Sequence, residues 1–384
     1  MNKRIFMLLL FVGFLFGCVD KKEPERMFYV HGLGVDYQDG EHIVYAQIIN
    51  FANVAKSEQP RTDIEQSEVM QGRGKTMVDA IYNFYRSVDE YVYWGNLTFI
   101  VFSEEVLKNG KMNMVLEAIT RFIETRYQVW VYSTKEPVEE VLLVTPINYS
   151  SIILSKLSDP ENSFEVDAYV HPVNIRELFI GLNEPGHELP IPAVGIWDNR
   201  QNSKGTKKAV AYDGVGIITT TGFKGTITDG SLEGFKWMHG NTTIGEVTFL
   251  YDTEDKDTPT EILINKVRVK TKPKVDEGEI KFDVQVKVTA TVNSISTNAD
   301  VDELKKRIEE EIRREILVTY HAALEINADI FGFSEQAYRK SFKDWKRVEE
   351  EGRIPLTEDT LDTVDVKVTK LVGGKKFLNP SIKK

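Results

Sequence analysis

Apolar residues in the first half of the chain recur with the two spacings that distinguish strands from helices. Short apolar or alternating stretches bounded by turn residues predict four strands, over 27–35, 43–51, 97–102 and 129–132. Apolar positions three or four residues apart predict three helices, over 76–88, 114–123 and 138–144. The polar stretch 54–71 is expected to be a loop or weakly extended. Strands and helices mixed in this order predict an α+β domain.

Two polar stretches near the middle of the chain predict a domain boundary. Residues 184–192 contain three prolines and a glycine, and residues 199–208 contain almost nothing apolar. Beyond them, residues 209–250 form short apolar stretches rich in glycine and threonine, which predict a small β-rich domain. The polar stretch 252–258 indicates a second break.

The last third of the chain has the clearest pattern. Residues 282–292 and 364–368 alternate between apolar and polar, so each predicts a strand with one buried face and one solvent-exposed face. Between them, apolar residues spaced by three and four from Val301 to Ala323 predict a long amphipathic helix. A second helix is predicted over 335–345. A helix packed over an antiparallel sheet would bury both apolar faces.

The first residues have the features of an export signal. Lys3 and Arg4 precede an apolar run over 5–16, which is too short to span a bilayer as a helix. The run ends in Leu15-Phe16-Gly17-Cys18, which resembles a lipobox, the signal after which a cysteine receives diacylglycerol. Cys18 is the only cysteine of the chain, so lipidation is its expected use. An uncleaved N-terminal anchor with an incidental cysteine is the alternative.

These patterns together predict an α+β protein with three domains of mixed antiparallel sheets and packed helices. The expected divisions are a signal peptide over 1–17, a lipidated tether over 18–26, an N-terminal α+β domain over 27–198, a small β-rich domain over 205–258 and a C-terminal α+β domain over 259–384. The C-terminal domain is expected to be a sheet covered by the long amphipathic helix.

Composition limits the classes of partner. The 48 basic and 59 acidic residues give a formal net charge of −11, and no basic patch of the kind that nucleic acid requires is visible. An acidic body is also not expected to adhere to an anionic lipid surface, so membrane attachment would depend on the lipid at Cys18.

The sequence contains no recognisable catalytic, cofactor-binding or metal-binding pattern. In Gly72-Arg73-Gly74-Lys75-Thr76, the first glycine of a phosphate-binding loop would fall at Val69. The six histidines are scattered, without the paired spacing of metal ligands. We therefore expect a protein that is not an enzyme and that holds no cofactor or metal. The large aromatic residues are expected in the core rather than at an interface: Trp94, Trp197, Trp237 and Tyr338.

Several short segments, in the same order along the chain, resemble motifs of the C subunits of spore nutrient germinant receptors, the Ger(x)C family of lipoproteins. The segments are Gly32-Leu33-Gly34-Val35-Asp36, Gly72-Arg73-Gly74-Lys75-Thr76, Trp94-Gly95-Asn96-Leu97, Tyr212-Asp213-Gly214-Val215-Gly216 and Asn327-Ala328-Asp329-Ile330-Phe331-Gly332-Phe333, followed by Tyr338 and Trp345. Two positions depart from the family pattern, because Val19 replaces a tryptophan after the lipobox cysteine and Asn96 replaces a histidine.

This resemblance implies a function. Such a C subunit is a non-catalytic lipoprotein, anchored to the outer face of the spore inner membrane beside two integral membrane subunits, A and B. The complex senses a small-molecule nutrient and triggers germination. The resemblance also implies a mixed α/β fold with three domains. One alternative from another class is a solute-binding lipoprotein of a transporter, although the two lobes typical of such proteins are not evident as a sequence repeat. A second alternative is an envelope enzyme, which a metal requirement or a defined substrate would favour.

Overall fold

The computed structural model describes residues 26–49, 66–121, 124–164, 170–203, 205–239, 245–250, 259–276, 278–294 and 300–373. The predicted signal peptide, Cys18 and the tether up to residue 25 lie outside the described residues. In the described part of the chain, no helix is long and apolar enough to span a membrane.

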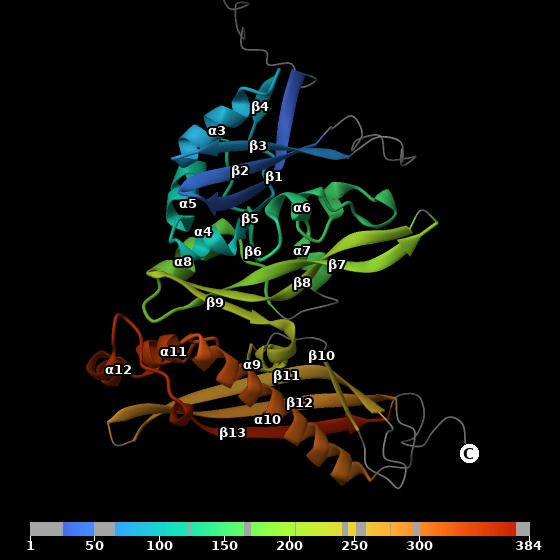
Figure 1. The fold of residues 1–384 in the computed structure, drawn as a ribbon. Coiled ribbons are helices and arrows are strands. Elements are labelled where there is room, and N and C mark those ends of the chain that lie inside the picture. Colours follow the sequence, from blue (N-terminus) through green and yellow to red (C-terminus); the bar gives the residue numbers. More distant parts are fainter. Residues whose placement is uncertain are drawn as a thin grey trace, which may run out of the picture.

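The first part of the chain builds a sheet that has nine strands within the described residues, in the order β3-β2-β1-β5-β6-β7-β8-β9, with β4 paired to β1 (Figure 1). The strands are β1 (Met27–Gln38), β2 (Glu41–Ile49), β3 (Ser67–Gly74), β4 (Tyr91–Tyr93), β5 (Phe99–Ser103), β6 (Trp130–Thr134), β7 (Leu189–Asn202), β8 (Gly205–Thr219) and β9 (Gly222–Thr228). β1 and β2 pair antiparallel around the predicted turn at Asp39-Gly40. β1, β5, β6 and β7 run parallel to one another, because helical segments return the chain between them.

Helices cover both faces of this sheet. They are α3 (Met77–Tyr85), α4 (Glu104–Lys108), α5 (Met112–Thr120), α6 (Val138–Leu143), α7 (Pro160–Phe164) and α8 (Ile175–Asn183), with 3₁₀ turns η2 (Ile147–Tyr149) and η3 (Ile152–Leu154). Successive residues of β5 face opposite sides of the sheet and belong to different buried clusters. Ile100 belongs to the cluster that contains residues of α3, α5 and α8, and Val101 belongs to the cluster that contains residues of α6. A strand buried on both faces explains the continuous apolar run at 97–102.

The strand β3 lies partly in the stretch 54–71, which was predicted to be a loop or weakly extended. Its residues 67–74 pair antiparallel with β2 along its whole length, and this cross-strand pairing overrides their polar composition. Two glycines on the strand then allow helix α3 to pack directly on it. A Cβ atom at Gly72 would lie 2.1 Å from the carbonyl oxygen of Ala80, and one at Gly74 would lie 2.4 Å from the nitrogen of Ala80.

This contact predicts that Gly72→Ala destabilises the fold by about 1–3 kcal/mol, because the added methyl group has to push backbone apart rather than a flexible side chain. Urea denaturation followed by circular dichroism measures the loss. Gly230→Ala is the matched control, since a Cβ there meets nothing within 4 Å. Equal stability of the two variants would contradict the close strand–helix contact.

The structure differs from the predicted boundary after residue 198. The polar residues 199–202 and 205–208 belong to the long β7–β8 hairpin, whose end extends beyond the rest of the sheet (Figure 1). Their polarity therefore reflects solvent exposure at a hairpin tip rather than a break between domains. The described part of 205–258 forms no sheet of its own, because β8 and β9 join the first sheet and β10 (Gly245–Leu250) joins the second.

The second sheet has the strand order β10-β11-β12-β13, with β11 (Pro259–Asp276), β12 (Glu279–Ser294) and β13 (Leu361–Val372). The long helix α10 (Val301–Glu325) covers one face, and its buried stripe matches the predicted one from Leu304 to Ala323. α11 (Phe333–Lys340), α12 (Phe342–Val348) and η5 (Glu358–Thr360) follow α10. The mixed α+β fold and the sheet with a long helix are thus confirmed.

One detail of the predicted C-terminal sheet was wrong. β12 and β13 are parallel rather than antiparallel. The physical reason is the connection between them, because α10 carries the chain back along the sheet so that β13 starts at the same end as β12.

The two sheets share one buried core. Val215 and Ile217 of β8 belong to the same cluster as the inward-facing valines of β12 and the apolar stripe of α10. Between the sheets lie η4 (Asp229–Ser231) and the short helix α9 (Glu233–Met238), which holds Trp237 in this cluster (Figure 1). The Trp237 indole Nε1 donates to Glu315 Oε2 of α10 at 2.5 Å. The two sheet-bearing parts are therefore packed against each other.

Candidate functional site

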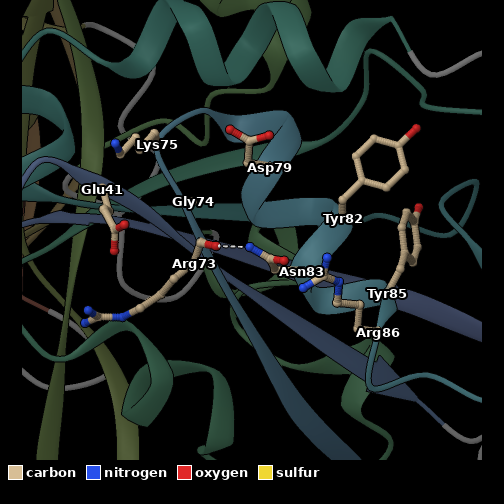
Figure 2. A pocket seen from close by; sticks show the side chains of 9 residues that line it. All are labelled: Glu41, Arg73, Gly74, Lys75, Asp79, Tyr82, Asn83, Tyr85 and Arg86. Carbon is tan, nitrogen blue, oxygen red and sulfur yellow. Dashed lines mark hydrogen bonds between the residues drawn. The ribbon is translucent and has the colours of Figure 1, made fainter.

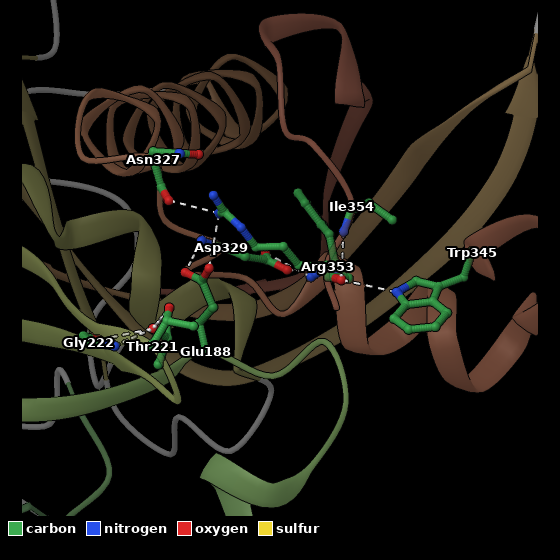
Figure 3. Close-up of polar contacts among 11 residues, drawn as sticks. Glu188, Thr221, Gly222, Asn327, Asp329, Trp345, Arg353 and Ile354 are labelled. Atoms are coloured by element: carbon green, nitrogen blue, oxygen red, sulfur yellow. Dashed lines mark hydrogen bonds and ion pairs between the residues drawn. The ribbon is translucent and has the colours of Figure 1, made fainter. Parts of the chain in front are cut away.

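A buried polar network joins the two sheet-bearing parts, and we call it the interface network (Figure 3). Glu188 immediately precedes β7 and is only 4% exposed. Its Oε1 accepts a hydrogen bond from Arg353 Nη1 at 3.1 Å, and its Oε2 accepts one from the backbone nitrogen of Asp329 at 2.7 Å. Arg353 Nη1 also donates to the carbonyl oxygen of Asn327 at 2.9 Å. One carboxylate of the first part thus holds two segments of the second.

Asp329 fixes the start of helix α11 within the same network. Its carboxylate oxygens accept hydrogen bonds from the backbone nitrogens of Phe333 at 2.9 Å and Ser334 at 2.6 Å. A carboxylate is favourable at this end of a helix, where N–H groups lack partners within the helix. The Ser334 hydroxyl then accepts from Ile354 N and Trp345 Nε1, so that α11, α12 and the following loop are held together.

A hydrogen bond and an ion pair flank the buried part of the interface network. His187 Nδ1 lies 2.6 Å from Glu335 Oε2, and Arg339 Nη2 lies 3.0 Å from Glu184 Oε1. Both pairs connect the loop before β7 with α11. Because Arg339 is 60% exposed, its pair with Glu184 contributes little stability, in the range of about 0–1 kcal/mol. The pair between Arg339 and Glu184 therefore orients the contact more than it strengthens it.

Burial changes the acidity of the network. Asp329 is fully enclosed, and the loss of hydration raises its pKa to about 7, although the N–H groups of Ser334 and Phe333 act in the opposite direction. The hydrogen bond from His187 lowers the pKa of Glu335, which is less buried. The network therefore holds a carboxyl group that changes charge near neutral pH next to the Glu188 carboxylate.

The segment 327–333, which sequence resemblance had singled out, supplies the centre of this network through Asp329. Its two partners, Glu188 and Arg353, were not found by sequence reasoning. Glu188 is one charged residue in a proline-rich stretch, and nothing local distinguishes it from a solvated side chain. Only the packing of the two parts reveals that it is buried.

A second feature is an open pocket of about 700 Å³ beside α3, which we call the α3 pocket (Figure 2). Its lining residues come from β2, β3 and α3 and include three cations, two carboxylates and two tyrosines: Arg73, Lys75, Arg86, Glu41, Asp79, Tyr82 and Tyr85. Asn83 Nδ2 donates to the carbonyl oxygen of Arg73 at 2.7 Å and ties the helix to the strand. The motif Gly72–Thr76 thus shapes this pocket and starts α3, where Thr76 caps the helix by accepting from Asp79 N.

The side chains that line the α3 pocket differ in charge and in exposure. Its lining mixes charges of both signs, and Tyr82 is 66% exposed. The Tyr85 hydroxyl accepts a hydrogen bond from Trp94 Nε1 at 2.7 Å, and burial raises the pKa of this tyrosine. A phenol held protonated in this way is a poor nucleophile.

No cluster of metal-ligating side chains is found among the residues that the structure describes. The predicted core positions of Trp94 and Trp237 are confirmed, because both are almost fully buried. Trp197 differs, since it is 42% exposed on β7, where the strand leaves the helix-covered part of the sheet. Cys18 lies outside the described residues, eight positions before the first of them.

Two family models match the chain in order. The model described as the spore germination protein N-terminal domain matches residues 20–196, and the model described as the spore germination B3/GerAC-like C-terminal domain matches residues 213–369. The fold and these matches define a spore germination protein. Because they cover most of its length, the chain belongs to the GerAC-like family, the Ger(x)C family indicated by its motifs.

Curated relatives agree with this assignment. Spore germination protein KC of Bacillus subtilis (strain 168) is 23% identical over 366 residues, which cover 90% of this chain and 89% of the relative. Spore germination protein B3 of the same organism is 26% identical over 286 residues, covering 73% of this chain and 71% of the relative.

The fold also matches a solved structure. The crystal structure of the GerBC protein superposes with a TM-score of 0.55 at 19% identity, covering 88% of this chain and 96% of that one. At this identity the match concerns the fold, which is therefore shared with GerBC.

Proposed function

We propose that this chain is the non-catalytic, lipid-anchored subunit of a membrane-bound nutrient germinant receptor and that it acts through contacts with integral membrane A and B subunits. The observation that carries the proposal is the match of both GerAC-like models, in chain order, to residues 20–196 and 213–369. In the proposed complex, a small-molecule nutrient is sensed by the assembly and germination follows.

The anchor in this proposal is Cys18, which would carry two acyl chains on the outer face of the spore inner membrane. Two chains are needed because a single acyl chain binds a bilayer only marginally, with a constant on the order of 10⁴ M⁻¹. The tether between Cys18 and Arg26 is short and charged, so the body would stay close to the membrane and to proteins embedded in it.

The interface network supports a role as a rigid contact body. It joins the two parts through Glu188, Asp329 and Arg353, in addition to the apolar core that both sheets share. A body whose parts are fixed relative to each other can present surfaces on both of them to membrane partners at the same time. The α3 pocket, which is open and of mixed charge, is one surface of this kind.

Removal of the gene from a spore former that lacks its other germinant receptors tests the proposal. We expect nutrient-triggered germination to be lost and to be restored by the intact gene, with germination by a non-nutrient trigger unchanged. Normal responses to every nutrient tested would contradict the receptor role. Calorimetry on the purified protein tests the alternative, because tight binding of a single amino acid or sugar by this chain alone would favour a solute-binding lipoprotein.

A further inference from the structure

Positively charged side chains are concentrated on the face of the second sheet opposite α10, although the net charge of the chain is −11. Along β11 and β12, residues alternate between a buried face, which packs against α10, and a solvent-exposed face. Val286 and Val288 point into the core, and Lys287 between them is exposed. The face opposite α10 is therefore built from the polar residues of each strand.

Strand register places three cationic side chains of this exposed face next to one another. Arg268 of β11 is the direct partner of Lys287 of β12, and Lys287 is the direct partner of Lys367 of β13. We call these three residues the cationic row. Three more exposed lysines surround it on β11 and β13: Lys266, Lys270 and Lys370. Asp365 of β13, opposite Gln285 and two residues before Lys367, places one acidic side chain beside this group.

The cationic row is not neutralised by the protein itself. Within the described residues, no ion pair involves Arg268, Lys287 or Lys367. Further along the same face, Lys274 pairs with both Asp283 and Asp362, so the sheet does neutralise charge elsewhere. Like charges directly opposite one another on neighbouring strands destabilise a sheet. The row thus costs stability in the isolated protein, and an acidic partner that covers it would remove this cost.

We propose that the cationic row and the lysines around it form a docking surface for an acidic, extended segment of a partner protein. Neighbouring strands lie about 4.8 Å apart, and alternate residues of a strand about 7 Å apart, so the cations form a flat grid. An extended segment with a carboxylate at every second residue has the same repeat of about 7 Å along its length. It can therefore pair with Lys266, Arg268 and Lys270 in succession.

The position of this surface favours a protein partner over the lipid bilayer. Strand β1 begins at one end of the molecule, and the second sheet lies at the other (Figure 1). This step rests on the proposed function, in which Cys18 is lipid-anchored. The bilayer then adjoins the end of the molecule where β1 begins, which is remote from the cationic row. The surface is then presented to proteins that extend away from the membrane.

Fluorescence anisotropy with a labelled peptide of alternating glutamate and threonine tests the surface. The protein is the mature chain, residues 18–384, carrying Cys18→Ala so that no lipid contributes. We expect the triple variant R268Q/K287Q/K367Q to bind the peptide at least about tenfold more weakly than the parent. Raising the salt concentration from about 50 to about 300 mM should weaken binding by the parent. K207Q/K306Q/K343Q, an equal charge change at exposed lysines elsewhere, is the control and should change affinity less than about twofold.

Thermal unfolding separates a binding effect from a folding defect. The triple variant should melt at the same temperature as the parent or a few degrees higher, because it relieves like-charge repulsion. Equal peptide binding by the triple variant and the control would overturn the proposal, as would the absence of peptide binding by the parent. Binding of the parent to vesicles of phosphatidylcholine and phosphatidylglycerol, without binding to the peptide, would overturn it in favour of a lipid surface. None of these outcomes depends on whether Cys18 is lipidated in spores.

Discussion

Replacement of Cys18 by alanine is expected to move most of the protein from the membrane fraction to the soluble fraction of disrupted spores. Each methylene group buried in a bilayer contributes about 0.8 kcal/mol, so the loss of two acyl chains removes far more free energy than surface contacts commonly supply. The acidic net charge of −11 offers no general attraction to anionic lipids in compensation. We expect at least about a tenfold loss of membrane-bound protein, measured by immunoblotting of the fractions.

Two controls make the Cys18→Ala result specific. Val19→Ala changes the neighbouring residue but keeps the thiol, and it should remain in the membrane fraction. The circular dichroism spectrum of the purified Cys18→Ala chain should match that of the unmodified protein, because the described core begins only at residue 26. If Cys18→Ala stays membrane-bound, contacts with partner subunits hold the protein, and the proposed anchor is wrong.

Replacement of Glu188 by alanine is expected to cost about 3–5 kcal/mol of the free energy of unfolding. The variant leaves the guanidinium of Arg353, which is 19% exposed, and the buried N–H of Asp329 without their shared acceptor. Breaking a buried pair by removing one partner is costly because the other charge remains desolvated. Urea denaturation with fluorescence detection measures the loss.

Glu184→Ala is the matched control for this variant. It removes the same side chain four residues earlier and also breaks an ion pair between the two parts, but Arg339 in that pair is 60% exposed. We expect a loss of about 1 kcal/mol or less. Similar losses for the two variants would show that burial of Glu188 is not what makes the interface network strong.

The pH dependence of the Glu188→Ala effect gives a second measurement. The pKa of Asp329 is about 7 in the folded protein and 3.8 in its unperturbed state. Because this pKa is raised on folding, the contribution of the Asp329 carboxyl group to the free energy of unfolding is fully present below about pH 4. This contribution is lost as pH rises through about 7. Above pH 7 its ionised carboxylate also repels that of Glu188. The loss caused by Glu188→Ala should accordingly be larger at pH 5 than at pH 8, and a loss that does not vary with pH would contradict this account.

Local sequence patterns predicted much of the fold because burial imposes a period on each element. The alternation at 282–292 and the stripe from Leu304 to Ala323 correspond to β12 and α10. The strand β3 was predicted only as a loop or a weakly extended stretch, since its residues are polar and its stability comes from pairing with β2. The hairpin tip at 199–208 was interpreted as a boundary because polar composition is the same at a linker and at an exposed turn.

The candidate site was predictable only in part. The family resemblance singled out Asp329 and the segment Gly72–Thr76. In the structure, Asp329 lies in the interface network. The segment Gly72–Thr76 forms the strand–helix contact beside the α3 pocket. Glu188 and Arg353 lie 165 positions apart. No local sequence pattern around either residue predicts that the two side chains form a pair.

Patterns among residues close together in the chain were enough to predict most strands and helices and the family, whereas lipidation of Cys18 stays a prediction. The tertiary structure decided the direction of β13, the burial of Glu188 and the alignment of Arg268, Lys287 and Lys367 in one row. Composition indicated an acidic chain without a basic patch, yet strand register gathers cations from three separate segments on one face. Register depends on how strands pair across the fold, and that pairing is settled by packing between residues distant in sequence.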